Sequence, residues 1–270
     1  GMYRAAGALT PELYEELATA VYAEMAAAGY TSVAEFHYVH HRQDGSPYPG
    51  HAMELALGRA AQAAGIRLTL LDTCYLAGGF GEPLTESQLR FSDGSAGAWL
   101  DRLKGLRHTF EAEFDPAYVT VGAALHSVRA VPEDALQAIA AGLDPDLPLH
   151  IHLSEQLAEN QDCLAATGLT PVQLLHRYGL LGPRLTAVHA THLTPEDVAL
   201  LANAGATVAM CPSTEADLAD GIGPAAALAD AGARIALGSD QLAVVDPWLE
   251  MRALDPGERL ASGVRGRFSP

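Results

Sequence analysis

The stretch LTAVHATHLTPEDVALLANAGATVAMCPS, residues 185–213, contains the pattern that decides the fold. An apolar run over 185–193 leads into a helical pattern over 193–205, and a second apolar run follows over 206–213. The helical pattern opens with a threonine, a proline and a glutamate, which suit a helix N-terminus, and it closes at a glycine. The stretch therefore predicts a strand, a helix and a second strand in succession.

The same alternation extends over most of the chain. Strands are predicted for TSVAEFHY (31–38), RLTLLDTCY (67–75), YVTVGAALHS (118–127), LPLHIHLSE (147–155), LTAVHATHL (185–193), ATVAMCPS (206–213) and RIALGSDQ (234–241). Helices are predicted from Thr10 to Gly29 and over 51–65, 131–142, 169–179, 193–205 and 223–232. Strict alternation of this kind indicates a parallel sheet built from right-handed βαβ units.

Two α/β architectures fit this order, an open doubly wound sheet and a TIM barrel. No glycine fingerprint follows the first strand, as a dinucleotide-binding sheet would require. Polar residues instead stand at nearly every strand end, where a (β/α)8 TIM barrel assembles its active site. These residues are Glu35, His37, Tyr38, Asp72, His126, His152, Glu155, His189, Ser213 and Asp240. We therefore predict one barrel domain over residues 1–270 that contains barrel strands 2–8 and lacks strand 1.

Two segments fall outside the alternation. Residues 76–95 form the longest irregular stretch, which is long enough to be an active-site loop. The segment from about Asp246 mixes helical and loop patterns, and we assign it no element.

Composition narrows the class of protein. The chain has 270 residues and a formal net charge of −17 without a basic patch, which argues against a nucleic-acid partner. The three cysteines have no CxxC spacing, so we predict neither a disulfide framework nor a thiolate zinc site, and we expect a cytoplasmic protein. No apolar run reaches membrane-spanning length, so no membrane partner is expected.

Two histidines and one aspartate stand out among the polar residues. His152, His189 and Asp240 each end a different predicted strand on the polar face of its alternation. Imidazole nitrogens and a carboxylate oxygen are ligands that suit zinc. His150 lies one pleat deeper than His152 and is the weaker candidate ligand.

Glu155 follows the strand that carries His152, and it allows two interpretations. Its carboxylate could accept a proton from water at the metal and pass it to a leaving group. It could equally be an acid placed at the N-terminus of the next helix. The residues alone leave both interpretations open.

Arg129, with His126 three residues before it, follows another predicted strand end. An arginine at a barrel mouth can clamp a carboxylate, although a surface arginine is commoner. Other polar and sulfur-containing residues receive structural interpretations. We expect Cys211 to be a small buried residue, and His51, His108 and His176 to lie in helical patterns. For Glu215, Asp217 and Asp220 we favour loop capping over substrate contact, and for His40 and His41 we favour solvation over ligand contact.

The motifs HIHLSEQ, VHATHL, CPSTEADLADG and GSDQ together resemble the metal-dependent amidohydrolase superfamily. Within it, VAEFHYVHH, ALHSVRAV and STEADLADG are similar to the formimidoylglutamate deiminases, and the similarity runs from MYR near the start to GERL near the end. The resemblance implies a cytoplasmic hydrolase of histidine catabolism that converts N-formimino-L-glutamate to N-formyl-L-glutamate and ammonia. It implies one zinc ion per subunit, with iron as the other metal to consider, and it allows a homodimer.

The resemblance also implies a role for each matching residue. His152 and Asp240 would bind the metal, whose bound hydroxide attacks the C=N carbon; Glu155 and Asp240 would transfer protons, and His189 would stabilise the tetrahedral species. The remaining matches, His126, Arg129 and Tyr38, would bind the substrate carboxylates.

The sequence departs from this pattern at important positions. The resemblance implies a His-X-His metal motif on barrel strand 1 and a β-sandwich formed by both termini, and we expect this chain to lack both. Asp217 stands where asparagine is expected, and Gly223 where an aromatic residue is expected. Two alternatives therefore remain: a related deaminase of a nucleobase or nucleoside, and a non-catalytic barrel fragment without a complete metal site.

Overall fold

The seven predicted strands are all present in the computed structural model, which describes residues 6–242 and 244–268. The chain divides into two compact units, residues 1–149 and residues 150–270. The strands are β1 (Ser32–His37), β2 (Arg67–Cys74), β3 (Val119–Leu125), β4 (Leu149–Leu153), β5 (Leu185–His189), β6 (Thr207–Met210) and β7 (Arg234–Leu237).

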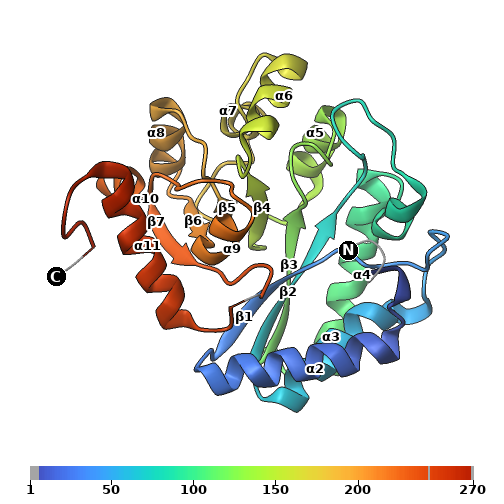
Figure 1. Ribbon diagram of the computed structural model, residues 1–270. Coiled ribbons are helices and arrows are strands. Elements are labelled where there is room, and N and C mark those ends of the chain that lie inside the picture. The colour runs from blue at the N-terminus through green and yellow to red at the C-terminus, as the bar shows by residue number, and fades with distance from the viewer. Residues whose placement is uncertain (1–5, 243, 269–270) are drawn as a thin grey trace. The chain divides into compact units, whose positions relative to one another are not determined.

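The first unit contains the parallel strands β1, β2 and β3 in that order. The register pairs His37 of β1 with Asp72 of β2, so the polar ends of these neighbouring strands lie at one level. Helix α3 packs against β2 and β3, α4 packs against the same two strands, and α2 lies against α3 (Figure 1). The helices of this unit are α2 (Pro11–Ala28), α3 (Ala52–Ala64), α4 (Ala96–Glu113) and α5 (Glu133–Gly142), with the 3-10 helices η1 (Pro49–His51) and η2 (Glu86–Phe91).

The second unit contains strands β4 to β7 in sequence order, and the pairs β5–β6 and β6–β7 are parallel. Its helices α10 and α11 both contact β7, while α7 packs between α6 and α8. The helices are α6 (Leu157–Thr167), α7 (Pro171–Arg177), α8 (Pro195–Asn203), α9 (Pro212–Asp217), α10 (Ala225–Asp230) and α11 (Pro247–Ser262).

The end signals found in the sequence act as predicted. Thr10, Thr170 and Thr194 each cap a helix through a side-chain oxygen that accepts a backbone N–H, with proline at the first helical position. Gly29 ends α2 at φ 103°, a conformation that L side chains rarely adopt. These local signals explain why the helix positions could be predicted without knowledge of the packing.

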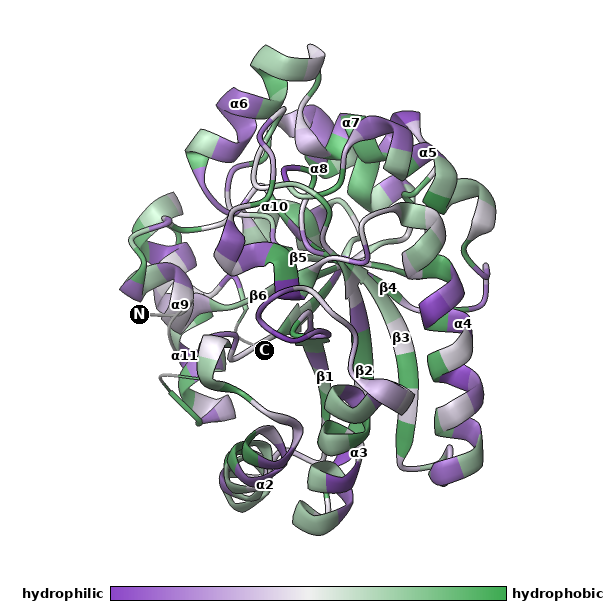
Figure 2. Ribbon diagram, turned by 90° about the vertical axis from the view of Figure 1, so that its right-hand side faces the viewer, coloured by the Kyte–Doolittle hydropathy of each residue, from purple (hydrophilic) through white to green (hydrophobic). Residues whose placement is uncertain are grey.

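Strand burial follows the predicted alternation in β4. Leu149, Ile151 and Leu153 are fully buried, and His150 and His152 between them are half-buried. Figure 2 shows β2 and β3 as mainly hydrophobic, while α4 carries both hydrophobic and hydrophilic residues. The polar histidines of β4 therefore occupy the less buried side of a strand whose other side is core.

The segments left unassigned prove to be helical in part. Helix α11 starts at an Asp246 N-cap, accommodates Pro256 in its interior and ends at Gly263. The irregular stretch 76–95 contains η2, which Thr85 and Gln88 open with reciprocal side-chain caps. Helices α4, α6 and α9 were not predicted, and α9 is only six residues long.

Among the described residues, no helix combines the length and the apolarity needed to cross a membrane.

Candidate active site

The second unit brings His152, His189 and Asp240 together. One potential ligand atom from each lies within 4.8 Å of the others. The rings of His152 and His189 stack with centroids 5.8 Å apart and an interplanar angle of 25°. The three residues come from the end of β4, the end of β5 and the segment after β7. Two imidazoles and one carboxylate at this spacing are a donor set that fits a zinc ion.

Left-handed backbone at the strand ends shapes this cluster. Ser154, His189 and Asp240 have φ values of 51°, 69° and 37°, which non-glycine residues adopt at an energetic cost. The N–H of Ala190 donates to the carbonyl of Leu153 at 2.9 Å and helps to hold the β5 end beside β4. Strained backbone of this kind persists where the surrounding structure fixes it, and it is common at functional sites.

Glu155 lies beside His189, as a proton-transferring residue would. Its Oε1 is 3.7 Å from His189 Nε2, and its side chain is largely buried. Helix α6 begins at Leu157 with Gln156 as its N-cap, so Glu155 stands outside the first turn. Glu155 therefore precedes the helix and lies near the ring of His189.

The carboxylates around His189 change its acid–base behaviour. Burial by itself lowers the pKa of His189, but the hydrogen bond with Glu215 and the charges of Glu155 and Asp240 outweigh burial and raise the pKa above its ordinary value. Burial raises the pKa of Asp240, and the charge of His189 opposes that change. The cluster is therefore an electrostatically coupled group.

His150 behaves differently from His152, as the strand alternation predicts. Burial lowers the pKa of His150 to about 4, which keeps its ring neutral near pH 7. None of the candidate metal clusters among residues 6–242 and 244–268 includes His150.

The first unit holds the three predicted substrate-binding residues. The ring of Tyr38 lies edge-on to the ring of His126 with centroids 5.2 Å apart. Arg129 is half-buried three residues after His126, between β3 and α5. The structure thus brings the rings of Tyr38 and His126 together, while Arg129 is half-buried and its Nε atom is fully buried.

Sequence reasoning missed Tyr75 and Phe91 in the same group. The ring centroids of Tyr75 and His126 are 4.5 Å apart, and those of Phe91 and Tyr38 are 5.2 Å apart. Gln88 donates a hydrogen bond to the hydroxyl of Tyr75 at 2.9 Å. The position of Tyr75 at a strand end was the signal that could have indicated a site residue, but an aromatic residue at that position is equally typical of the hydrophobic core.

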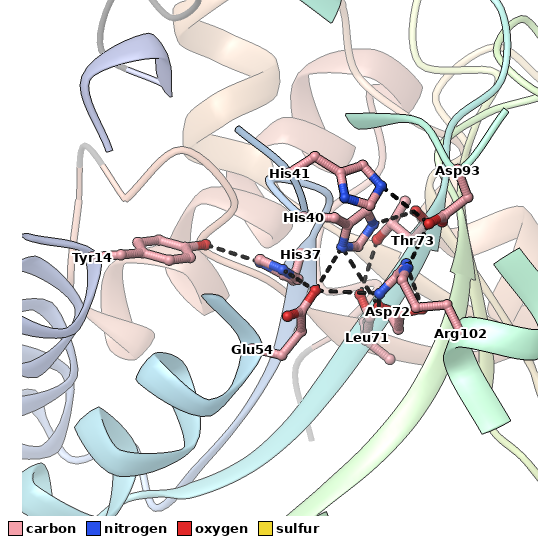
Figure 3. A network of polar contacts seen from close by, with 10 residues as sticks. All are labelled: Tyr14, His37, His40, His41, Glu54, Leu71, Asp72, Thr73, Asp93 and Arg102. Atoms are coloured by element: carbon pink, nitrogen blue, oxygen red, sulfur yellow. Dashed lines mark hydrogen bonds and ion pairs between the residues drawn. The ribbon is translucent and has the colours of Figure 1, made fainter. Parts of the chain in front are cut away.

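The expectation that His40 and His41 are solvated is wrong. Both are buried, and Figure 3 shows them in a network of charged residues. His40 Nδ1 lies 3.0 Å from Glu54 Oε1, and His41 Nε2 lies 3.1 Å from Asp93 Oδ1. Arg102 bonds both oxygens of the Asp72 carboxylate, at 2.8 and 3.0 Å. The loop after β1 folds inward because helix α3, strand β2 and helix α4 supply partners that the local sequence does not reveal.

Glu54 is the central acceptor of this network. Its Oε1 also lies 3.2 Å from His37 Nε2 and 3.2 Å from Arg102 Nη1. Burial opposes ionisation of Glu54, but its hydrogen bonds with His37 and His40 hold the pKa of the carboxyl well below its ordinary value. His37, His40 and Glu54 also satisfy the spacing of a metal cluster. The 3.0–3.2 Å separations are those of hydrogen bonds, so we interpret the group as a charge network.

The remaining residues of the predicted loop differ in role. Cys211 is buried, and burial raises the pKa of its thiol far above the ordinary value, which agrees with a structural residue. Glu215 accepts the N–H of Cys211 at the start of α9, as a capping acid would, and also lies 3.4 Å from His189 Nδ1. Asp217 accepts a hydrogen bond from Gln241, and the Asp220 carbonyl lies 2.7 Å from His192 Nε2.

The strand-end site and the parallel βα architecture agree with the chain's sequence relationships. The amidohydrolase family matches residues 2–268, so the chain belongs to this family. Its fold is of the amidohydrolase type: an amidohydrolase of Brucella melitensis superposes with a TM-score of 0.93 and 38% identity, covering 100% of this chain and 59% of that one.

Two curated relatives are enzymes that remove nitrogen from their substrates. Formimidoylglutamate deiminase of Pseudomonas aeruginosa is 45% identical over 270 residues, 99% of this chain and 58% of that protein. The 8-oxoguanine deaminase of the same species is 31% identical over 236 residues, 86% of this chain and 50% of that protein. The chain therefore spans about half to three fifths of the length of these relatives.

Proposed function

We propose that the chain is part of a metal-dependent deiminase that hydrolyses N-formimino-L-glutamate to N-formyl-L-glutamate and ammonia. The observation that carries the proposal is the cluster of His152, His189 and Asp240 with Glu155 beside it. The 45% identity to a formimidoylglutamate deiminase, over 99% of this chain, supports the substrate.

His152 and Asp240 would hold the metal, for which zinc is the first candidate and iron the second. The only His-X-His in the sequence is His150–His152, so the further histidine ligands implied by the resemblance have no match in this chain. When bound, such an ion acts as a Lewis acid and makes hydroxide available near neutral pH.

The protein side chains would move the protons. Water adds to the C=N carbon, and Glu155 and Asp240 accept the protons that water releases. Glu155 passes the first proton to the imino nitrogen, and Asp240 takes the second from the new C–OH group. When this second proton also reaches the nitrogen, the C–N bond breaks, ammonia leaves and the carbon becomes a formyl group. His189 would stabilise the tetrahedral species through Nε2, which faces both Glu155 and Asp240 at 3.7 and 3.9 Å.

Arg129, His126 and Tyr38 would bind the two carboxylates of the substrate. A guanidinium provides paired N–H donors that match a carboxylate, which a protein of net charge −17 needs for a dianionic ligand. The proposal also includes the cytoplasmic location and the role in histidine degradation that the resemblance implies.

A nucleobase deaminase is the second candidate, because the chain is 31% identical to an 8-oxoguanine deaminase. A neutral base needs no carboxylate clamp, so substrate choice separates the two candidates. A non-catalytic barrel fragment is the third.

Ammonia release tests all three candidates. The purified 270-residue chain is supplied with zinc, its metal content is measured, and N-formimino-L-glutamate, 8-oxoguanine and adenosine are assayed in parallel. We expect bound zinc and ammonia from the formimino substrate alone. Ammonia from a base alone would establish the second candidate, and absence of both zinc and turnover would establish the third.

A further inference from the structure

The carboxylate of Glu215 joins the backbone of the second unit to a catalytic side chain. Its Oε1 accepts the backbone N–H of Cys211 at 2.8 Å and lies 3.4 Å from His189 Nδ1. Glu215 is 4% exposed and His189 is 1% exposed, so solvent does not replace either contact.

Local structure fixes the position of Glu215. Helix α9 begins immediately after β6, and Cys211 is its N-cap. The backbone N–H of Glu215 donates to the carbonyl of Cys211 at 2.9 Å, while its side chain accepts the N–H of the same residue. Two hydrogen bonds to one residue leave the carboxylate little freedom to turn away from His189.

This arrangement determines which nitrogen of His189 carries a hydrogen. Since Oε1 of Glu215 already acts as an acceptor, the contact is a hydrogen bond only if Nδ1 donates. Nε2 is then the nitrogen that faces Glu155 and Asp240. A fixed Nδ1–H thus leaves Nε2 for the chemistry of the site.

His189 needs such a restraint. Its φ is 69°, and that of Ala190 is 51°, so two successive residues are in a left-handed conformation that costs energy. Rotation of the ring about its Cβ–Cγ bond would exchange its two edges and take Nε2 away from Glu155. A hydrogen-bond partner on the Nδ1 side opposes this rotation and helps to hold the residue in its left-handed conformation.

We propose that Glu215 is a positioning residue that holds the ring of His189 in one orientation and keeps hydrogen on Nδ1. The role of this ring in the reaction rests on the proposed function. The placement of hydrogen on Nδ1 rests only on the contacts of Glu215.

Nuclear magnetic resonance of the full chain with 15N-labelled histidine tests the placement. A His189→Asn variant identifies the signals of His189 by their loss. We expect wild-type His189 to carry hydrogen on Nδ1. Hydrogen on Nε2 alone in the wild-type chain would overturn the proposal without any further variant.

Two substitutions of Glu215 separate the acceptor from side-chain size. Glu215→Met keeps the length and removes the acceptor, and we expect it to abolish the preference for Nδ1–H. Glu215→Gln keeps an acceptor oxygen, and we expect it to restore the preference. A Glu215→Met spectrum identical to the wild-type one, from a chain that circular dichroism shows to be folded, would contradict the proposal.

Glu250 provides a matched control. It lies in α11 and is 1% exposed, and its carboxylate accepts hydrogen bonds from the backbone N–H and the hydroxyl of Ser213, which is in α9 as Glu215 is. Glu250→Met should leave the His189 signals unchanged. Equal changes in both Met variants would show that loss of any buried acid at α9 disturbs His189, and would overturn the specific role of Glu215.

Kinetics adds a separate measurement if the chain hydrolyses the formimino substrate. Loss of a residue that hydrogen-bonds and orients a side chain of a metal site typically lowers activity by about 10- to 100-fold. We expect Glu215→Met to lower kcat by that factor with KM little changed, and Glu215→Gln to recover part of it. Without turnover the proposed function fails, while the NMR spectra still decide the role of Glu215.

Discussion

The histidines of this chain show how strongly surroundings determine the behaviour of one residue type. His108 and His176 lie on helices, as predicted, and the structure shows both to be exposed. His150 has a pKa lowered to about 4 by burial, whereas the acids around His189 raise its pKa. Position on a strand distinguished His152 from His150 in the sequence, but the acids that surround His189 come from separate elements.

Arg129 gives a test at the level of one residue. Replacing it with glutamine removes the charge that would bind a substrate carboxylate, and a hydrogen bond to a charged group is worth about 1.5–3 kcal/mol. We expect KM for N-formimino-L-glutamate to rise by about 10- to 100-fold, measured by steady-state ammonia release.

Zinc content and a second arginine provide the controls for that test. Arg129→Gln should bind as much zinc as the wild-type chain. Arg107, which pairs with Asp144 and is about one-third exposed, should tolerate the same substitution without a change in KM. A parallel loss of zinc and activity in Arg129→Gln would contradict its assignment to substrate binding.

At the scale of elements, the buried charge network ties together the ends of β1 and β2 (Figure 3). Helix α3 contributes Glu54 and helix α4 contributes Arg102, whose Nη1 donates to Oε1 of Glu54 at 3.2 Å. His37 and His40 stand on either side of Tyr38 in sequence, and both lie within hydrogen-bonding distance of Glu54. The network therefore holds the backbone that carries Tyr38.

Glu54→Gln tests the network. Removing one partner of a buried charged group typically costs about 3–5 kcal/mol, and we expect a loss of this size in urea unfolding at pH 7. The pKa of Glu54 is lowered in the folded chain, so its contribution is present above the unfolded value of about 4.3 and is lost as pH falls. The difference in free energy of unfolding between the wild-type chain and Glu54→Gln should therefore shrink below about pH 4.

Glu15 is the control for that experiment. It pairs with Arg59 at 2.7 Å on the surface, where such pairs contribute about 0–1 kcal/mol. A Glu15→Gln variant as unstable as Glu54→Gln, or a difference that does not change with pH, would refute the special role of the buried network.

Packing of α3 against the end of α4 gives a second element-scale prediction. A Cβ added at Gly58 would lie 2.6 Å from Cε2 of Phe114, which is too close. Gly58→Ala should lower the free energy of unfolding by about 1–3 kcal/mol, although alanine is the better helix former.

Gly105 in α4 is the matched position. A Cβ there would meet His51 Nε2 at 3.4 Å, an ordinary contact. Gly105→Ala should be neutral or stabilising by up to about 1 kcal/mol in the same urea measurement. Equal behaviour of the two variants would contradict the close contact at Gly58.

At the scale of the whole molecule, metal binding should be coupled to folding. His152, His189 and Asp240 are far apart in sequence and meet only in the folded chain. Zinc at 100 times its dissociation constant should then stabilise the chain by about 2.7 kcal/mol, measured by thermal unfolding. The stabilisation should be absent from a His152→Gln, Asp240→Asn double variant, and its persistence there would exclude this cluster as the site.

Much of the fold was accessible from the sequence because its signals are local. The seven strands were predicted from short apolar runs, and Thr10, Thr170 and Thr194 marked helix starts through contacts within one turn. The buried residues Trp99, Leu103, Leu106 and Phe110 of α4 recur at helical spacing, a signal that our prediction did not use. Helix α11 was missed because Pro256 normally ends a helix.

The sequence by itself determined the order of the seven strands and of the helices with clear end signals, and it placed His152, His189 and Asp240 at or just after strand ends, because chain periodicity and turn chemistry specify both. Only the tertiary structure decided that His40 and His41 are buried and that Glu215 faces His189. Their partners are contributed by other elements. A hydrogen bond between residues distant in sequence leaves no periodic trace, so packing alone assigns these side chains their roles.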